Sequence, residues 1–149
     1  MGAITRIFLL GMFMIVFNFG PFSKDELTVT LDPAGAELLR SKIFELLADP
    51  SHDQFADCLH CTERVFHDAR IRFQMEEIDS VNLASNKLLL CLSRDALTYA
   101  QDQLTEFLGK GYFYPAEFWS CQRSGRKYAT QILFAKFNSL NDMIFSARD

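Results

Sequence analysis

The segment LTVTLDPAGAELLRSKIFELL, residues 27–47, passes from a strand pattern to a helix pattern within a few residues. Residues 27–31 alternate and are rich in β-forming side chains, which predicts a strand. Asp32 and Pro33 predict a helix start, because an aspartate can cap the first turn and proline needs no amide partner at the first helical position. The helix is expected to end at Asp49 and Pro50. Its core-facing residues are expected to be Ala36, Leu39, Ile43, Leu46 and Leu47.

The same order of elements returns 61 residues further along, where LLLCLSRDALTYAQDQLTEFL occupies residues 88–108. Ser93 takes the capping place of Asp32, and Gly109 is predicted to end the second helix in a left-handed conformation. Two interpretations stay open. The likeness is either a degenerate duplication of a strand–helix unit or the resemblance that any two such units share. The residues expected to face the core in the second helix are Leu97, Ala100, Leu104, Phe107 and Leu108.

The rest of the chain supplies further elements. Residues 51–69 carry apolar side chains at helical spacing, and Ser51 with Gln54 forms a capping-box pattern, so a helix is predicted there. From Ala69 to Met75 apolar and polar residues alternate, which predicts a half-buried strand. Three more strands are predicted in 87–92, 112–121 and 128–137.

We therefore predict an α+β protein with a single, mainly antiparallel sheet of about five to six strands and roughly two or three helices packed on one face. The chain has 149 residues, of which 49% are hydrophobic and 23% charged, as in an ordinary globular domain. A chain of this length can bury a core without disulfides or metal. Residues 13–149 are predicted to form one domain. Residues 1–12 are predicted to be an extension: an anchor, a signal or the product of a mis-assigned start.

The run IFLLGMFMIVFNFGPF, residues 7–22, carries no charged side chain and has three interpretations. In the first, residues 14–19 form a buried strand and the true start is Met12 or Met14. In the second, the run is a signal peptide or anchor, but it lacks the small residues that a signal peptidase reads. In the third it is a membrane-spanning helix, which needs about 20 apolar residues, more than the run provides.

Net charge and cysteine content limit which partners and which cellular compartment can be predicted. A formal net charge of −4 disfavours binding to nucleic acid and is compatible with a basic protein partner. Four cysteines are too few for a small secreted disulfide scaffold, so we predict reduced cysteines in a cytoplasmic protein. The alternative is a protein that is secreted, or anchored to a membrane through residues 7–19. Membrane association and oligomeric state stay open.

The segment CLHC, residues 58–61, is the only C-x-x-C pair in the chain. A structural zinc site needs a second pair, so no metal and no cofactor are predicted; if the chain bound a metal, Cys58 and Cys61 would hold it. On the predicted helix, Cys58 lies in the core and Cys61 at its margin. His60 and His67 then point away from the apolar face and lie about two turns apart, too far to share one ion.

The chain contains no nucleophile elbow, zinc-protease motif, P-loop or dinucleotide-binding motif, so we predict that it is not an enzyme. Glu117 lies among apolar residues and is expected to pair with Arg123 or Arg126 across a hairpin. The segment RSGRK, residues 123–127, is predicted to be a solvated hairpin tip, because the anion-binding alternative would need a helix N-terminus there.

The segment GYFYPAEFWSC, residues 111–121, concentrates aromatic residues beside arginines, a composition common at protein interfaces. We therefore predict a small, non-enzymatic domain that binds another protein through an aromatic-rich sheet surface. Bacterial immunity proteins, and other inhibitors or adaptors, offer an analogy of size and acidity and not a family match. The predicted binding residues are Tyr112, Tyr114, Glu117, Phe118, Trp119 and Arg123.

Two alternative functions remain. The chain is a soluble domain held at a membrane by residues 7–19, or it is a small enzyme or metal-binding protein whose site assembles from distant residues. In the second alternative the site would draw on Cys58, His60, Cys61, His67 and Glu117.

Overall fold

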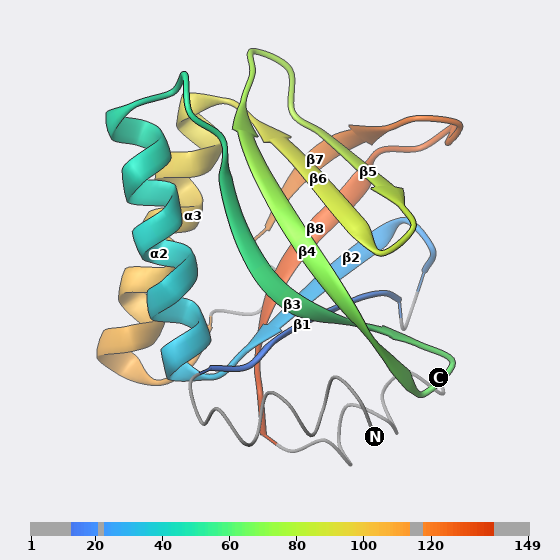
Figure 1. Ribbon diagram of the computed structural model, residues 1–149, viewed down its shortest axis with the longest axis horizontal. Helices are drawn as coiled ribbons and strands as arrows, with labels where there is room; N and C mark the ends of the chain where they lie inside the picture. The colour runs from blue at the N-terminus through green and yellow to red at the C-terminus, as the bar shows by residue number, and fades with distance from the viewer. Residues whose placement is uncertain (1–12, 21–22, 114–117, 139–149) are drawn as a thin grey trace.

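The computed structural model describes residues 13–20, 23–113 and 118–138, and Figure 1 shows their arrangement. One sheet curls into a closed barrel, and two helices lie side by side at one end of it. The predicted extension, residues 1–12, lies outside the described residues. The elements are β1 (Ile15–Phe19), β2 (Glu26–Leu31), α2 (Pro33–Ala48), β3 (Gln54–Thr62), β4 (Val65–Met75), β5 (Ser80–Ala84), β6 (Lys87–Leu92), α3 (Arg94–Lys110), β7 (Phe118–Arg123) and β8 (Thr130–Lys136).

The strands follow the order β1-β2-β8-β7-β5-β6-β4-β3 around the barrel, and β3 pairs with β1 to close the ring. Strands of one hairpin pair in an antiparallel manner, whereas strands of different hairpins pair in parallel. The predicted α+β class is therefore confirmed. The predicted open, mainly antiparallel sheet of about five to six strands is wrong, because the sheet is mixed, closed and larger.

Residues 51–69, predicted as a helix, form a turn, β3 and the beginning of β4 instead. The prediction failed because the second half of β3 is covered on both faces. Cys58 belongs to the main core and Cys61 to a second, smaller apolar cluster, so the two-residue period of a strand is hidden. The turn that follows gave no signal either. Glu63 and Arg64 adopt φ values of 50° and 66°, a conformation usually found at Asn and Gly.

The chain contains the same structural unit twice: a hairpin, a helix and a second hairpin. The pairing register repeats as well as the order. Glu26 lies opposite Gln131 in the β2–β8 pair, and Lys87 lies opposite Arg70 in the β6–β4 pair, a shift of 61 residues on each strand. The likeness seen in the sequence over one strand and one helix therefore extends to the topology of the whole unit, as expected of a duplication.

Two short parallel seams, β1–β3 and β5–β7, lie at equivalent places in the two units. They match residue for residue, so His60 of the first unit corresponds to Arg123 of the second. His60 lies near the end of β3, and Arg123 is the last residue of β7. Both strands end where the barrel carries the hairpin turns, opposite the helices (Figure 1). The paired residues are Val16–Leu59 and Phe17–His60 in the first seam, and Ser80–Gln122 and Val81–Arg123 in the second.

The start of α2 is tied to β1 through one carboxylate. Asp32 accepts hydrogen bonds from the amides of Gly35 (2.6 Å) and Met14 (2.9 Å), so the predicted helix cap also anchors the first strand. The strand interpretation of the apolar N-terminal run is confirmed for Ile15–Phe19. Neither α2 nor α3, the helices of the described residues, is long and apolar enough to cross a membrane.

The predicted start of α3 is confirmed, and its predicted end is wrong. Ser93 caps the helix by accepting a hydrogen bond from the Ala96 amide at 3.2 Å. The helix continues through Gly109 and ends at Gly111, whose φ of 86° is the left-handed conformation expected of a C-terminal glycine. Gly109 is tolerated inside the helix, so Lys110 is still helical.

The barrel interior is filled by side chains from both helices and from the sheet. One void inside the barrel that is lined by described residues has a volume of about 10 Å³, no more than one water molecule needs. This void is lined by Val29, Leu39, Ile43, Ile71, Phe73, Leu90, Leu92, Ala100, Trp119, Ile132 and Phe134.

Substitution of Gly35 tests the junction between β1 and α2, and substitution of Gly109 in α3 is its control. A Cβ at Gly35 would lie 2.2 Å from the Met14 carbonyl oxygen, so Gly35→Ala should destabilise the protein by about 1–3 kcal/mol despite the better helix propensity of alanine. A Cβ at Gly109 would meet nothing within 4 Å, so Gly109→Ala should stabilise by about 0.5–1 kcal/mol. Urea unfolding of both variants measures the difference, and a stabilised Gly35→Ala protein would contradict the close approach.

Candidate functional site

The cysteines of the C-x-x-C segment do not converge. Cys58 and Cys61 lie three positions apart on a strand, so their side chains point to opposite faces of the sheet. Cys58 is buried in the main core, as predicted. The prediction that Cys61 lies at the margin of the core is wrong, because it is 2% exposed inside the second apolar cluster. Within the described residues, no group of three or more His, Cys, Asp or Glu side chains could hold a metal ion.

Burial keeps the thiols protonated. It raises the pKa of the Cys58 thiol strongly, with a further contribution from the charge of Asp57, and it also raises the pKa of Cys61. The pKa of Cys121 rises to about 12, mainly through burial. Since the thiolate is the reactive form, these three side chains are poor nucleophiles and poor metal ligands near neutral pH.

The two histidines of the β3–β4 hairpin are neighbours. The prediction that they lie about two helical turns apart is wrong, because His60 is paired with His67 across the strands, with ring centroids 6.5 Å apart. His60 stacks on Phe17 at 4.5 Å between centroids, and its Nδ1 lies 2.8 Å from the Oδ1 of Asn86. That oxygen can only accept, so Nδ1 donates and His60 serves as a bridge between the β3 and β5–β6 ends.

A serine, a histidine and an aspartate contact one another after α2, but their geometry is that of a turn. His52 Nδ1 lies 2.7 Å from Asp49 and 3.1 Å from the hydroxyl of Ser51, so both contacts use the same ring nitrogen. A catalytic triad needs the two nitrogens on opposite sides of the ring. The Ser51 and His52 hydrogen bonds lower the pKa of Asp49, as expected for a carboxylate that closes an exposed turn.

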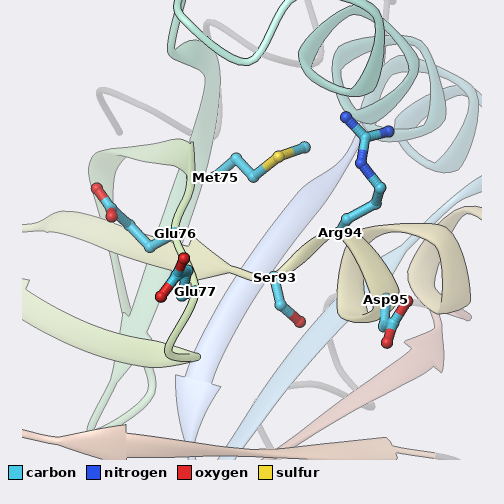
Figure 2. A pocket seen from close by; sticks show the side chains of 6 residues that line it. All are labelled: Met75, Glu76, Glu77, Ser93, Arg94 and Asp95. Atoms are coloured by element: carbon cyan, nitrogen blue, oxygen red, sulfur yellow. The ribbon is translucent and has the colours of Figure 1, made fainter.

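An open depression of about 510 Å³ lies where β4 ends and α3 begins (Figure 2). The side chains of Glu76, Arg94 and Asp95 point in different directions there and do not meet at a common point. The Ser93 amide, at the helix cap, already donates to the Asp79 carboxylate at 2.6 Å. The depression therefore lacks the converging polar groups of a small-molecule site. It is lined by Met75, Glu76, Glu77, Ser93, Arg94 and Asp95.

The residues predicted to bind a partner are distributed over several surroundings. Tyr112 is 48% exposed just beyond the end of α3. Trp119 is half-buried and packs against the main core, while Arg123 lies at the opposite end of β7. Tyr114 and Glu117 lie outside the described residues, and the side chain of Phe118, which begins β7, is outside them as well.

A first surface feature that the sequence interpretation missed is the aromatic–arginine patch, formed by Asp53, Phe55, Asp57, Arg70 and Arg72 on β3, β4 and the residue before β3. Phe55 was expected on a buried helical stripe, but it is 45% exposed. The Arg70 and Arg72 guanidinium carbons lie 5.9 and 5.7 Å from the centre of its ring. Arg70 Nε donates to Asp57 at 3.1 Å, and Arg72 Nε donates to Asp53 at 2.7 Å.

A second missed feature is the arginine platform, formed by Phe19, Lys24, Asp25, Arg123 and Arg126 at the end of the barrel that carries the hairpin turns. Arg123 lies over the ring of Phe19 at 3.9 Å and donates to the Lys24 carbonyl at 3.3 Å. Arg126 donates to the Asp25 carboxylate at 3.2 and 2.9 Å. The predicted hairpin turn is confirmed, since the Arg126 amide bonds to the Arg123 carbonyl.

Among the C-x-x-C cysteines, the histidines of the β3–β4 hairpin and the turn after α2, the described residues place no thiol, hydroxyl or carboxylate in a catalytic arrangement with a base. Two charged surface features remain. Comparison with protein-family models found no match. Comparisons with curated proteins and with solved structures found none either.

Cys121 gives a test of thiol burial through pH. An unfolded cysteine ionises near pH 8.5, whereas the native Cys121 thiol ionises near pH 12, so the unfolded state loses its proton first. The stability that Cys121 contributes is complete below about pH 8.5 and should then fall by about 1.4 kcal/mol per pH unit toward pH 12. We expect the difference in unfolding free energy between the native protein and Cys121→Ala to follow this slope in urea titrations. A difference that stays constant up to about pH 10 would rule out a buried thiol.

Proposed function

We propose that this chain is a small, non-enzymatic domain that binds another protein through the aromatic–arginine patch. The observation that carries the proposal is an exposed phenylalanine, Phe55, held on a rigid strand pair between two arginines. Aromatic residues and arginine are the side chains that most often dominate binding energy at protein interfaces.

The patch is organised before any partner arrives. Phe55 lies directly opposite Arg72, and Asp57 lies directly opposite Arg70, so the strand register fixes the positions of all four side chains. Each arginine is also held by a carboxylate, which reduces the conformational entropy that binding would have to remove. The patch is therefore suited to bind without rearranging.

The chemistry of the patch defines what a partner must present. An apolar side chain would cover the Phe55 ring, and carbonyl or carboxylate oxygens would accept hydrogen bonds from the arginines. A guanidinium has five N–H donors, and the ion pairs of Arg70 and Arg72 occupy only one or two nitrogens on each.

The second structural unit provides an internal comparison. The ion pair of Asp57 with Arg70 corresponds by register to Ser120 and Gln131, where the serine hydroxyl donates to the glutamine side chain at 3.0 Å. A neutral pair thus occupies the equivalent position in the sheet. The charges on β3 and β4 are accordingly not needed to form the barrel, which favours a role in recognition.

Photo-crosslinking tests the proposal in the cells that make the protein. With p-benzoylphenylalanine in place of Phe55, we expect a crosslink to one partner protein, whose contact peptide is then identified by mass spectrometry. Phe44 is the matched control, because it is a phenylalanine that is 64% exposed on another element, α2, and it does not belong to the patch.

The identified partner is then purified and its affinity measured by calorimetry. Phe55→Ala and Arg72→Ala should each weaken binding by about tenfold or more, whereas Phe44→Ala should leave the affinity unchanged. Phe55→Ala should also unfold at nearly the same urea concentration as the native protein, because exposed positions contribute within about 0.5 kcal/mol. Equal crosslinking from positions 44 and 55, or equal affinities, would refute the proposal.

A further inference from the structure

The arginine platform concentrates positive charge where the barrel carries its turns. The turn between β7 and β8 directs two guanidinium groups at adjacent residues of the β1–β2 connection, since Arg123 reaches the Lys24 carbonyl and Arg126 reaches the Asp25 carboxylate. Lys127, the next residue along the chain, adds a further positive charge to this turn, with its Nζ 5.6 Å from the ring of Tyr128. A chain with a net charge of −4 therefore carries a locally basic surface.

The positive charge of the platform is only partly neutralised by the described residues. Asp25 is bound to Arg126, and the hydrogen bond of Arg123 goes to a carbonyl oxygen. Arg123 is also half-buried against Phe19. Burial lowers the pKa of Arg123, the charge of Arg126 lowers it further, and the charge of Asp25 acts in the opposite direction, so the two guanidinium groups are close enough to repel each other.

The fold does not require this arrangement, as the equivalent position of the first unit shows. There His60 takes the place of Arg123, and Asn86 takes the place of Asp25. His60 stacks on Phe17 as Arg123 lies over Phe19, and it bonds to Asn86 across the end of the barrel. A pair of side chains without a permanent charge, one from each unit, thus lies at this place, whereas the equivalent place has Arg123 and Asp25, with Arg126 beside them.

We propose that the arginine platform is an oxyanion-binding site, which takes a phosphoryl or carboxylate group of a ligand between Arg123 and Arg126. The Phe19 ring holds the plane of one guanidinium, and Asp25 orients the other. Planar guanidinium groups match the oxygen atoms of phosphate and carboxylate in pairs, which lysine does not. This site lies on other strands than the aromatic–arginine patch, so the two proposals are independent and can be tested separately.

Nuclear magnetic resonance of the arginine side chains tests the site directly. The full chain, labelled with ¹⁵N, is titrated with inorganic pyrophosphate and, separately, with a hexaglutamate peptide, and the Nε–Hε signals are followed. Sodium chloride at matched ionic strength is the control for screening. We expect saturable shifts of Arg123 and Arg126 with at least one probe, and no such shift of Arg94, which lies on α3 at the other end of the barrel.

If only pyrophosphate gives saturable shifts, the ligand is a phosphoryl compound. If only hexaglutamate does, the ligand is an acidic peptide. If both do, the probe with the lower dissociation constant identifies the ligand class. Arg126→Gln, at a partly exposed position, should weaken the responsive probe by about tenfold or more, with Arg94→Gln as the unaffected control. Arg123→Gln should give the same loss, with folding checked by the dispersion of the amide spectrum. Shifts no larger than those caused by sodium chloride, or shifts unchanged in Arg126→Gln, would overturn the proposal.

Discussion

An aspartate carboxylate fixes each helix at the point where it leaves the barrel, and the rest of the arrangement depends on these two junctions. Asp32 belongs to the cap of α2 and reaches back to the Met14 amide beside β1. At the other junction the direction is reversed, because Asp79 precedes β5 and reaches forward to the Ser93 amide at the cap of α3. In both cases the first strand of a hairpin is held against the start of the helix. The helices therefore leave the same end of the barrel, where they pack on each other, and the hairpin turns gather at the opposite end (Figure 1).

The parts of this fold that could be predicted are those whose signals are local. The Asp32–Pro33 pair and Ser93 mark helix starts through capping, which depends on residues a few positions apart. Closure of the barrel could not be predicted in this way. The β2–β8 pair joins Glu26 to Gln131, and the choice of such a distant partner leaves no periodic trace in either strand. The helix predicted over part of the β3–β4 hairpin was wrong for a related reason. The second half of β3 is covered on both faces, so its apolar residues follow the spacing of a helical stripe.

The sequence did not predict the two candidate surfaces, because each depends on contacts between strands. The aromatic–arginine patch depends on the β3–β4 hairpin, and the arginine platform depends on residues that are far apart in the chain. Phe55 is exposed only because β3 is a strand, and Arg72 lies beside it only through the β3–β4 register. Arg123 was singled out by the sequence, but its contacts with Phe19 and Lys24 bring together residues about a hundred positions apart. Local sequence could identify side chains suited to recognition and could not say which of them would meet.

The two surfaces differ in how their charges are balanced, so the main source of binding free energy and its dependence on salt should differ between them. In the aromatic–arginine patch, Arg70 and Arg72 are each paired with a carboxylate, so the proposed partner would gain mainly from covering Phe55. Such binding should respond weakly to salt. In the arginine platform, the Asp25 carboxylate pairs with Arg126 while Arg123 bonds to a carbonyl oxygen, so the proposed anion would gain from charge that the described residues leave unbalanced. Exposed charges of this kind are screened over about 10 Å at 0.1 M salt, and binding there should weaken steeply as salt is added. The two proposed binding surfaces thus differ in kind, and at each of them charged side chains stand where the equivalent place of the repeat has a neutral pair.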